Sequence, residues 1–250
     1  MKVHRAELRE IERMRDIYRH EMNCQVIHDS IHGRPGWTHE YLISEGGAKA
    51  GYGSVAVAGP WQAKPTVYEY FLLPQHRRRL VDAFVALLTA SGATASEAQS
   101  TDVLLTAMLH AFAPAGASES ILFHDRVTTA HALPDAVFRR ATPGDAGPMA
   151  ERRLDAEARW RVAVGAAGAG AGDILFHYHR PYGDIHMAVG GPFRRRGVGT
   201  YLVQELKRVC YEGGSVPAAR CNPRNVASRQ TLQRAGFVPC GHILTGTVAL

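Results

Sequence analysis

The chain has 250 residues, of which 46% are hydrophobic and 21% are charged, as in ordinary globular proteins. This composition excludes a largely disordered chain, and the length allows one large core or two small ones. No apolar stretch is long enough to span a membrane, and the N-terminus leads into a charged helix instead of a signal-peptide core. We therefore expect a cytoplasmic protein with no membrane partner.

The net charge of +6 suits a polyanionic ligand, which includes nucleic acid. The two densest arginine clusters are Arg77 to Arg79 and Arg194 to Arg196, and each lies at a strand-to-helix turn. No basic stripe is interleaved with aromatic residues, and no DNA- or RNA-binding motif is present. We therefore expect a small polyanionic ligand and no nucleic-acid partner.

The first half of the chain combines predicted strands and helices. Its predicted elements are a helix at 6–22, strands at 38–44, 52–58 and 66–73, helices at 77–88 and 103–112, and a strand at 121–123. The strand at 66–73 carries Glu69 and is ended by Pro74. Residues 132–134 are the predicted linker to the second half.

The candidate metal ligands of the first half do not make a metal site. His28, Asp29 and His32 lie between the first helix and the first strand, but a third ligand with matching spacing is absent. A lining role in a substrate pocket is the interpretation we prefer. The cysteines have no metal-like or redox-motif spacing and are expected to be free thiols: Cys24, Cys210, Cys221 and Cys240.

The second half repeats the pattern of the first. Its predicted elements are a strand at 137–140, a short helix after the turn at 142–144, a hairpin of 160–164 and 174–179, a strand at 185–189 and a helix at 201–211. The Ala/Gly-rich segment 165–172 is predicted to be the hairpin turn. Pro74 and Pro192 each precede an arginine triplet and lie 118 residues apart (192 − 74), while Tyr41 and Trp160 lie 119 apart (160 − 41). This constant offset indicates an internal duplication.

The turn between the strand at 185–189 and the next helix is typical of an anion-binding loop. It consists of Arg194, Arg195, Arg196, Gly197, Val198, Gly199 and Thr200. Two glycines let successive N–H groups converge, and the helix directs its positive dipole end to the same point. Arg194 can also bind phosphate oxygens through two nitrogens. The first half has Gln75 to Leu80 at this position, without a Gly-x-Gly turn, so we expect no nucleotide cofactor there.

The spacing Arg194-x-x-Gly197-x-Gly199 resembles the coenzyme A pyrophosphate loop of the GNAT superfamily of acyl-CoA-dependent N-acyltransferases. The resemblance continues with Asn225, with Ser228 three residues later, and with Gly236-Phe237, and it covers about residues 184–237. It implies an α/β (α+β mixed sheet) protein of two fused GNAT-like lobes. Residues 135–250 would be the acetyltransferase domain that binds acetyl-CoA, and residues 1–134 a degenerate lobe that walls the substrate site.

The resemblance also implies roles for individual residues. The pantetheine arm of coenzyme A would pair with the strand edge at Met187, Ala188 and Val189, while the loop, Asn225 and Ser228 would hold the rest of the cofactor. The reaction implied is direct attack of a primary amine, on a small molecule or peptide, at the thioester carbonyl. The attacking amine must be neutral, so a base has to remove its proton.

Three residues are candidates for that base. Asp184 stands about where relatives often place a carboxylate, His186 shares its strand face, and Glu69 occupies the equivalent strand of the first half. Tyr182 and the residues His177, Tyr178 and His179 could line the pocket. Many relatives carry a tyrosine as the acid that protonates the thiolate, but Leu232 stands there, which leaves Ser228 or Tyr201 as alternatives.

The expected partners are acetyl-CoA and an amine substrate, for a monomer or a homodimer. An alternative from another class is a catalytically silent acyl-CoA-binding regulatory module. The sequence does not distinguish between acceptor amines or between acyl chains.

Overall fold

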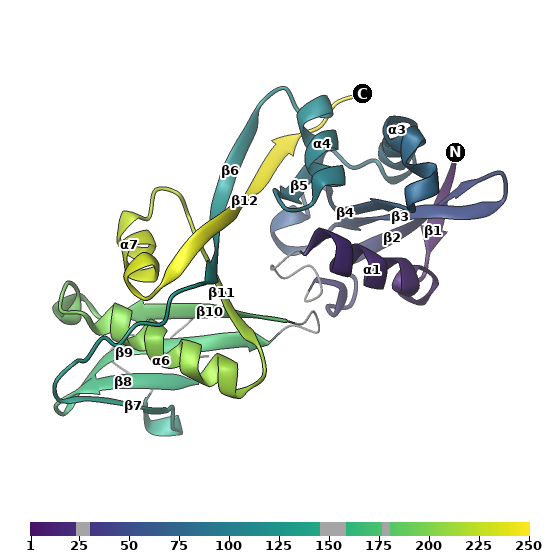
Figure 1. Cartoon of the computed structure of the whole chain (residues 1–250). Helices are drawn as coiled ribbons and strands as arrows, with labels where there is room; N and C mark the ends of the chain where they lie inside the picture. Colours follow the sequence, from purple (N-terminus) through teal and green to yellow (C-terminus); the bar gives the residue numbers. More distant parts are fainter. Residues whose placement is uncertain (24–30, 146–158, 177–180) are drawn as a thin grey trace. The chain divides into compact units, whose positions relative to one another are not determined.

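A computed structural model describes residues 1–23, 31–145, 159–176 and 181–250. The chain is a mixed α/β protein that divides into two compact units (Figure 1). Unit 1 consists of Met1–Ser120 and Gly241–Leu250, and unit 2 consists of Ile121–Cys240. Helices and strands are named as they are labelled in Figure 1.

The elements of the first copy run from β1 to β6. They are β1 (Lys2–Ala6), α1 (Leu8–Met22), β2 (Thr38–Glu45), β3 (Ala48–Ala56), η1 (Gly59–Trp61), β4 (Thr66–Leu72), η2 (Pro74–Arg79), α3 (Leu80–Ser91), β5 (Ala95–Gln99), α4 (Val103–Phe112) and β6 (Gly116–Asp125). Residues of α3 and α4 pack with Tyr41 and Ile43 of β2, whereas residues of α1 pack with the intervening Leu42. Since neighbouring strand residues point to opposite faces, α1 covers one face of this sheet and α3 and α4 cover the other.

The elements of the second copy run from β7 to β12. They are β7 (Ala136–Arg140), η3 (Pro143–Asp145), β8 (Trp160–Val164), β9 (Ala167–Phe176), β10 (Tyr182–Val189), η4 (Gly191–Phe193), α6 (Val198–Glu212), β11 (Val216–Cys221), α7 (Val226–Arg234) and β12 (Phe237–Thr247). The core of unit 2 lies between α6, represented by Leu202 and Leu206, and strand residues that include Val162 and Ile185.

The structure confirms the duplication in three dimensions. The register shifts between Ile43 and Ser44 in the β2–β3 hairpin and between Val162 and Ala163 in the β8–β9 hairpin, again an offset of 119 residues (162 − 43). Close helix–sheet contacts repeat as well: a Cβ on Gly53 would lie 2.3 Å from Leu87, and a Cβ on Gly172 would lie 2.6 Å from Leu206. Both pairs are related by the same offset. The two copies therefore share bulges and close approaches as well as sequence spacing.

The prediction that residues 165–172 form the turn of the second hairpin is wrong. β8 ends at Val164 and β9 begins at Ala167, so the turn consists of only the two residues between them. The small residues have a packing role, because α6 crosses directly over this strand. A Cβ on Gly170 would lie 3.2 Å from Leu202, and one on Gly172 would lie still closer to Leu206, at 2.6 Å. The Ala/Gly-rich composition thus reflects a closely packed strand.

Each unit is completed by a strand that follows the other copy in sequence. In unit 1 the strand order is β1-β2-β3-β4-β5-β12, and in unit 2 it is β6-β11-β10-β9-β8-β7. β12 follows α7 of the second copy, yet its Ile243 pairs with Gln99 of β5. β6 follows α4 of the first copy, yet its Ile121 pairs with Cys221 of β11. The domain boundary after residue 134 stays a prediction, since the compact units divide the chain after residues 120 and 240.

This exchange predicts that the second copy does not fold by itself. A fragment of residues 136–250 lacks Ile121 to His124, which pair with β11, and lacks Phe123, which is fully buried in the core of unit 2. We expect insoluble protein or a fragment with no cooperative melting transition, because the β11 edge and the apolar surface under Phe123 become exposed to water. A monomeric fragment that melts cooperatively would contradict this expectation. A fragment of residues 121–240, which keeps the part of β6 that pairs with β11, is the matched comparison.

Candidate functional site

Strands β10 and β11 separate in the middle of the unit 2 sheet. Their parallel pairing joins Tyr182–Asp184 to Val216–Ala218, and beyond Asp184 the described residues give β10 no further partner on β11. On its other side β10 stays paired with β9 as far as Val189. The second half of β10 therefore has an open edge toward β11.

Backbone N–H and C=O groups of β10 point toward this open edge, where an added strand could pair with them. The carbonyl oxygens of His186 and Ala188 face β9, where a Cβ on Gly172 or Gly170 would lie 3.1 and 3.4 Å from them. Because backbone groups alternate along a strand, those of Met187 and Val189 face the open edge. The carbonyl of Val189 already accepts a hydrogen bond from Arg194 Nε at 3.3 Å.

The loop after β10 brings several N–H groups to one point. Gly197 is the N-cap of α6 with φ +83°, and Arg195 has φ +60°, a left-handed conformation that costs a residue with a Cβ about 1 kcal/mol. In the part of the chain that the structure describes, no acceptor takes the N–H groups of Val198, Gly199 and Thr200. Such a turn at a helix N-terminus is suited to an anion.

The arginines of the two copies differ in their charge partners. In unit 1, Arg77 forms an ion pair with Glu21 at 2.6 Å and Arg79 forms one with Asp82 at 2.6 Å. In unit 2, none of the described carboxylates pairs with the triplet Arg194–Arg196; Arg196 instead lies over the ring of Phe193. Two of the three arginines of the first copy thus have carboxylate partners, whereas those of the second have none among the described residues.

Asn225 and Ser228 lie at the start of α7. The side chain of Asn225 accepts a hydrogen bond from the backbone N–H of Ser228 at 3.1 Å and so caps the helix. Ser228 also contacts the Cys221 thiol at the end of β11. Burial raises the pKa of that thiol, although Arg229 and the hydrogen bond with Ser228 oppose the shift. Asn225 and Ser228 therefore position the start of α7 beside the end of β11.

Asp184 and His186 lie together at the point where the strands separate. Asp184 is buried with 1% of its surface exposed, and its Oδ2 lies 3.3 Å from His186 Nε2. Burial alone would lower the pKa of His186, but the hydrogen bond and charge of Asp184 reverse this, and the pKa is raised. Because His186 is partly exposed, it is the member of the pair that can exchange a proton with a ligand.

Sequence reasoning missed Arg220, which approaches the same carboxylate. Its Nε lies 3.6 Å from Asp184 Oδ2, across from β10 on β11. Ala218 is the register partner of Asp184, and Arg220 stands two residues later on the same face. Residues 216–221 show no alternation of polar and apolar side chains, so they carry no clear sequence signal for a strand.

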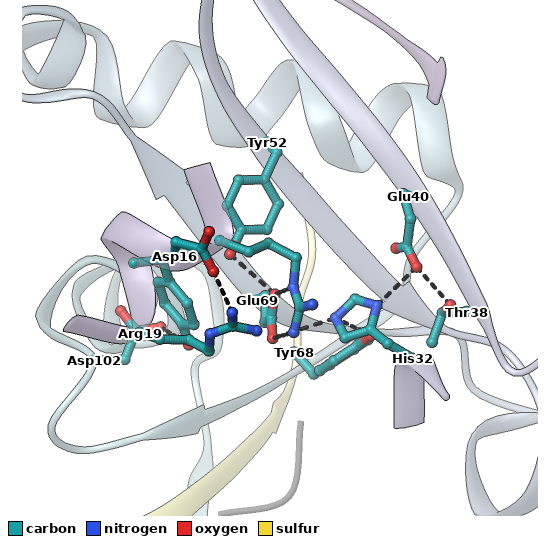
Figure 2. Close-up of polar contacts among 11 residues, drawn as sticks. Asp16, Arg19, His32, Thr38, Glu40, Tyr52, Tyr68, Glu69 and Asp102 are labelled. Atoms are coloured by element: carbon teal, nitrogen blue, oxygen red, sulfur yellow. Dashed lines mark hydrogen bonds and ion pairs between the residues drawn. The ribbon is translucent and has the colours of Figure 1, made fainter. Parts of the chain in front are cut away.

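Glu69, the third candidate base, is the centre of a buried polar cluster in unit 1 (Figure 2). It accepts hydrogen bonds from Arg15 at 2.9 and 3.1 Å and from the hydroxyl of Tyr52 at 3.0 Å. Burial alone would raise the pKa of Glu69, but the charges of Arg15 and His32 hold it well below its usual range. Glu69 is therefore a fully buried, ion-paired carboxylate.

His32 extends this cluster to β2. Its Nδ1 lies 2.9 Å from Glu40 Oε1, and its Nε2 lies 2.9 Å from the Tyr68 hydroxyl and 3.3 Å from Glu69 Oε1 (Figure 2). Burial opposes the charged imidazole, but the two glutamates prevail and raise the pKa of His32 to about 9. Among the described residues no group of histidine, cysteine and carboxylate side chains is arranged to hold a metal ion.

Some predicted residues lie outside the described part of the chain: Cys24, His28, Asp29, His177, Tyr178 and His179. Asp184 and His186 lie on the same strand as the open edge and directly before the anion loop, all within unit 2. Glu69 lies in unit 1. Tyr182 is half-buried at the start of β10, and Leu232, which replaces the family tyrosine, is buried in the core of unit 2.

A family model described as "Acetyltransferase (GNAT) domain" matches residues 108–238. No curated protein sequence matches the chain. No helix of the described residues is both long enough and apolar enough to cross a membrane.

Several solved structures are similar over the whole chain. A GNAT-family acetyltransferase from Colwellia psychrerythraea has a TM-score of 0.80 at 14% identity, with 100% of both chains covered. A tandem GNAT protein from the clavulanic acid biosynthesis pathway has a TM-score of 0.67 at 13% identity, covering 100% of this chain and 99% of that one. A GCN5-related N-acetyltransferase from Sphaerobacter thermophilus has a TM-score of 0.62 at 15% identity, covering 97% and 94%. At these identities the likeness shows the fold.

The His32 cluster predicts a specific dependence of stability on pH. The folded-state pKa of His32 is raised from 6.5 to about 9, so its contribution is fully present below pH 6.5 and is lost as the pH rises through 9. The charged groups around it are Arg15 on α1, Glu40 on β2 and Glu69 on β4. Melting temperatures of the full chain between pH 6 and 10 should fall by several degrees across this range.

The variant His32→Gln is the matched comparison for that measurement. It should melt at a lower temperature than the wild type at pH 6 and lose most of the decline between pH 6.5 and 9. An equally steep decline in both proteins would show that another group is responsible.

Proposed function

The chain belongs to the GNAT acetyltransferase family, and we propose that its second copy transfers the acetyl group of acetyl-CoA to a primary amine of a small molecule or peptide. Acyl-CoA-dependent acetyl transfer is the reaction of the family. The observation that carries the proposal is the arginine loop Arg194–Thr200, which has no ion-pair partner among the described carboxylates and lies directly after the open edge of β10. The first copy has a comparable strand separation but pairs its arginines with carboxylates.

The residues of unit 2 fit a coenzyme A molecule. The N–H groups of Val198, Gly199 and Thr200, which have no acceptor among the described residues, would bind the diphosphate, with Arg194 to Arg196 supplying positive charge around it. The backbone groups of Met187 and Val189 would pair with the pantetheine arm as with an added strand, with Ala188 between them. Asn225 and Ser228 would border the thiol end from α7. When bound, the cofactor supplies an acetyl thioester, whose carbonyl is open to attack by an amine.

We assign His186 as the base that accepts the proton of the attacking amine. Its Nε2 faces Asp184, so the other ring nitrogen, Nδ1, is the one left to take the proton. Asp184 is buried and acts as a positioning residue: it orients the imidazole and makes it more basic. Arg220 places a positive charge beside the same carboxylate, with its Nε 3.6 Å from Asp184 Oδ2. Glu69 is held as an anion by Arg15 inside unit 1, and we assign it to the stability of that unit.

A backbone N–H of the open edge is the donor that would stabilise negative charge on the carbonyl oxygen. Leu232 supplies no acid for the departing thiolate, so Ser228 or Tyr201 would have to serve. The thiol of coenzyme A is itself a fairly good leaving group, and we expect loss of an acid to slow turnover by only about one to two orders of magnitude.

The cofactor assignment predicts that Gly197→Val weakens coenzyme A binding at least about tenfold. Gly197 has φ +83°, and a Cβ there would lie 2.6 Å from His131 Nε2, so the variant distorts the loop and places bulk where the diphosphate binds. Calorimetric titration of the full chain with coenzyme A measures this.

Two controls separate the loop from general strain. Gly165→Val imposes a side chain at φ +60° in the same unit, with no neighbour within 4 Å, and should bind as the wild type does. Leu80→Phe changes the matched turn of the first copy and should also leave binding intact. Equal affinity of Gly197→Val and wild type would refute the assignment.

The catalytic assignment is tested by incubating the protein with acetyl-CoA and a panel of amines while following free thiol. With an accepted amine, His186→Gln should lose about 10²–10⁴-fold in rate together with the acidic limb of the pH-rate profile. Asp184→Asn should shift that limb to lower pH, because Asp184 raises the pKa of His186. If His186→Gln keeps the acidic limb, deprotonation uses another route.

A further inference from the structure

The segment that follows β6 runs along α6 (Figure 1), and side chains of that helix bind its backbone. Lys207 Nζ donates a hydrogen bond to the carbonyl of Val127 at 2.9 Å. Nearly one turn earlier on α6, Gln204 Oε1 accepts from the N–H of His131 at 2.7 Å, and Gln204 Nε2 donates to the carbonyl of His131 at 3.2 Å. Two side chains of α6 therefore fix the backbone path from Val127 to His131.

The start of this path is held rigidly. Lys207 is buried with 5% of its surface exposed, and its Nζ also lies 2.7 Å from Asp125 Oδ1 and donates to the carbonyl of Ala235 at 2.6 Å. Gly236 has φ +92°, and a Cβ there would lie 1.9 Å from the carbonyl oxygen of Val127. The segment can approach α6 and α7 this closely only because residue 236 is glycine.

The path ends at the anion loop. The imidazole of His131 lies against Gly197, the N-cap of α6, with Nε2 2.6 Å from the position of a Cβ on that glycine. His131 itself is exposed, so its ring is accessible to a ligand. A ring nitrogen is thus positioned beside the loop whose Val198, Gly199 and Thr200 N–H groups have no acceptor among the described residues.

We propose that His131 is a further cofactor-binding residue, which donates an imidazole N–H hydrogen bond to the diphosphate of coenzyme A bound at Arg194–Thr200. Gln204 is its positioning residue, because it holds both the N–H and the carbonyl of His131. The inference rests on the proposed function of the loop. It makes the segment after β6 a wall of the cofactor site, built within unit 2 from residues that precede β7.

Calorimetric titration with coenzyme A tests the proposal. Because a hydrogen bond to a charged group is stronger than one between neutral groups, His131→Ala should weaken binding about tenfold or more, while His131→Gln, which keeps an N–H donor, should lose less. His110→Ala, an exposed histidine on α4 of unit 1, is the control and should bind as the wild type does. Affinity of His131→Ala that equals or exceeds that of the wild type would overturn the proposal.

Two further arms make the test specific. Gln204→Ala should weaken binding without adding to the effect of His131→Ala in the double variant; additive losses would contradict the positioning role. Titration with 3′-dephospho-coenzyme A should give the same loss on His131→Ala, because this ligand keeps the diphosphate. Disappearance of the loss would overturn the assignment to the diphosphate. If the wild type binds neither ligand, the proposed function itself fails.

Discussion

The separation of β10 from β11 after Asp184 is the constraint on which the site of unit 2 depends. Two parallel strands that stay paired to their ends leave no backbone group for a ligand. Here the pairing stops at Asp184, so the rest of β10 has an open edge that leads directly into the arginine loop. The same point exposes His186 beside its buried carboxylate. The groups proposed to bind the cofactor and to transfer the proton therefore lie on or directly after the same strand, β10.

Strand separation alone does not make a cofactor site, as the first copy shows. β4 pairs with β5 only from Thr66 to Val67, and Tyr68 is an extra residue opposite β3, where the register shifts. Yet the turn after β4 contains no glycine, and its arginines are paired with Glu21 and Asp82. On the corresponding strand face of unit 1, Glu69 is enclosed by Arg15, Tyr52 and His32. The first copy thus has the same strand separation as the second, but an ion-pair cluster around Glu69 lies where the second copy has its proposed site.

The Gly-x-Gly turn indicated the arginine loop, because that loop depends on residues close together in the chain. The repeated proline–arginine spacing indicated the duplication, and the resemblance to a known family implied the fold class. The exchange of β6 and β12 could not be predicted, since Ile121 pairs with Cys221, 100 residues away (221 − 121), and Gln99 pairs with Ile243, 144 residues away (243 − 99). The Ala/Gly-rich strand β9 was mistaken for a turn because its composition reflects α6, a later element. Arg220 and the partners of Glu69 were missed because they lie on other elements, distant in the sequence from the residues they contact.

Hydrogen–deuterium exchange with and without coenzyme A tests the central claim most directly, because it reports on backbone amides of both copies in one experiment. The account predicts slower exchange at residues 195–200 and 187–189 when coenzyme A is added, and no change at residues 75–80 of the first copy. Protection at residues 75–80, or the absence of protection at residues 195–200 under saturating coenzyme A, would contradict it.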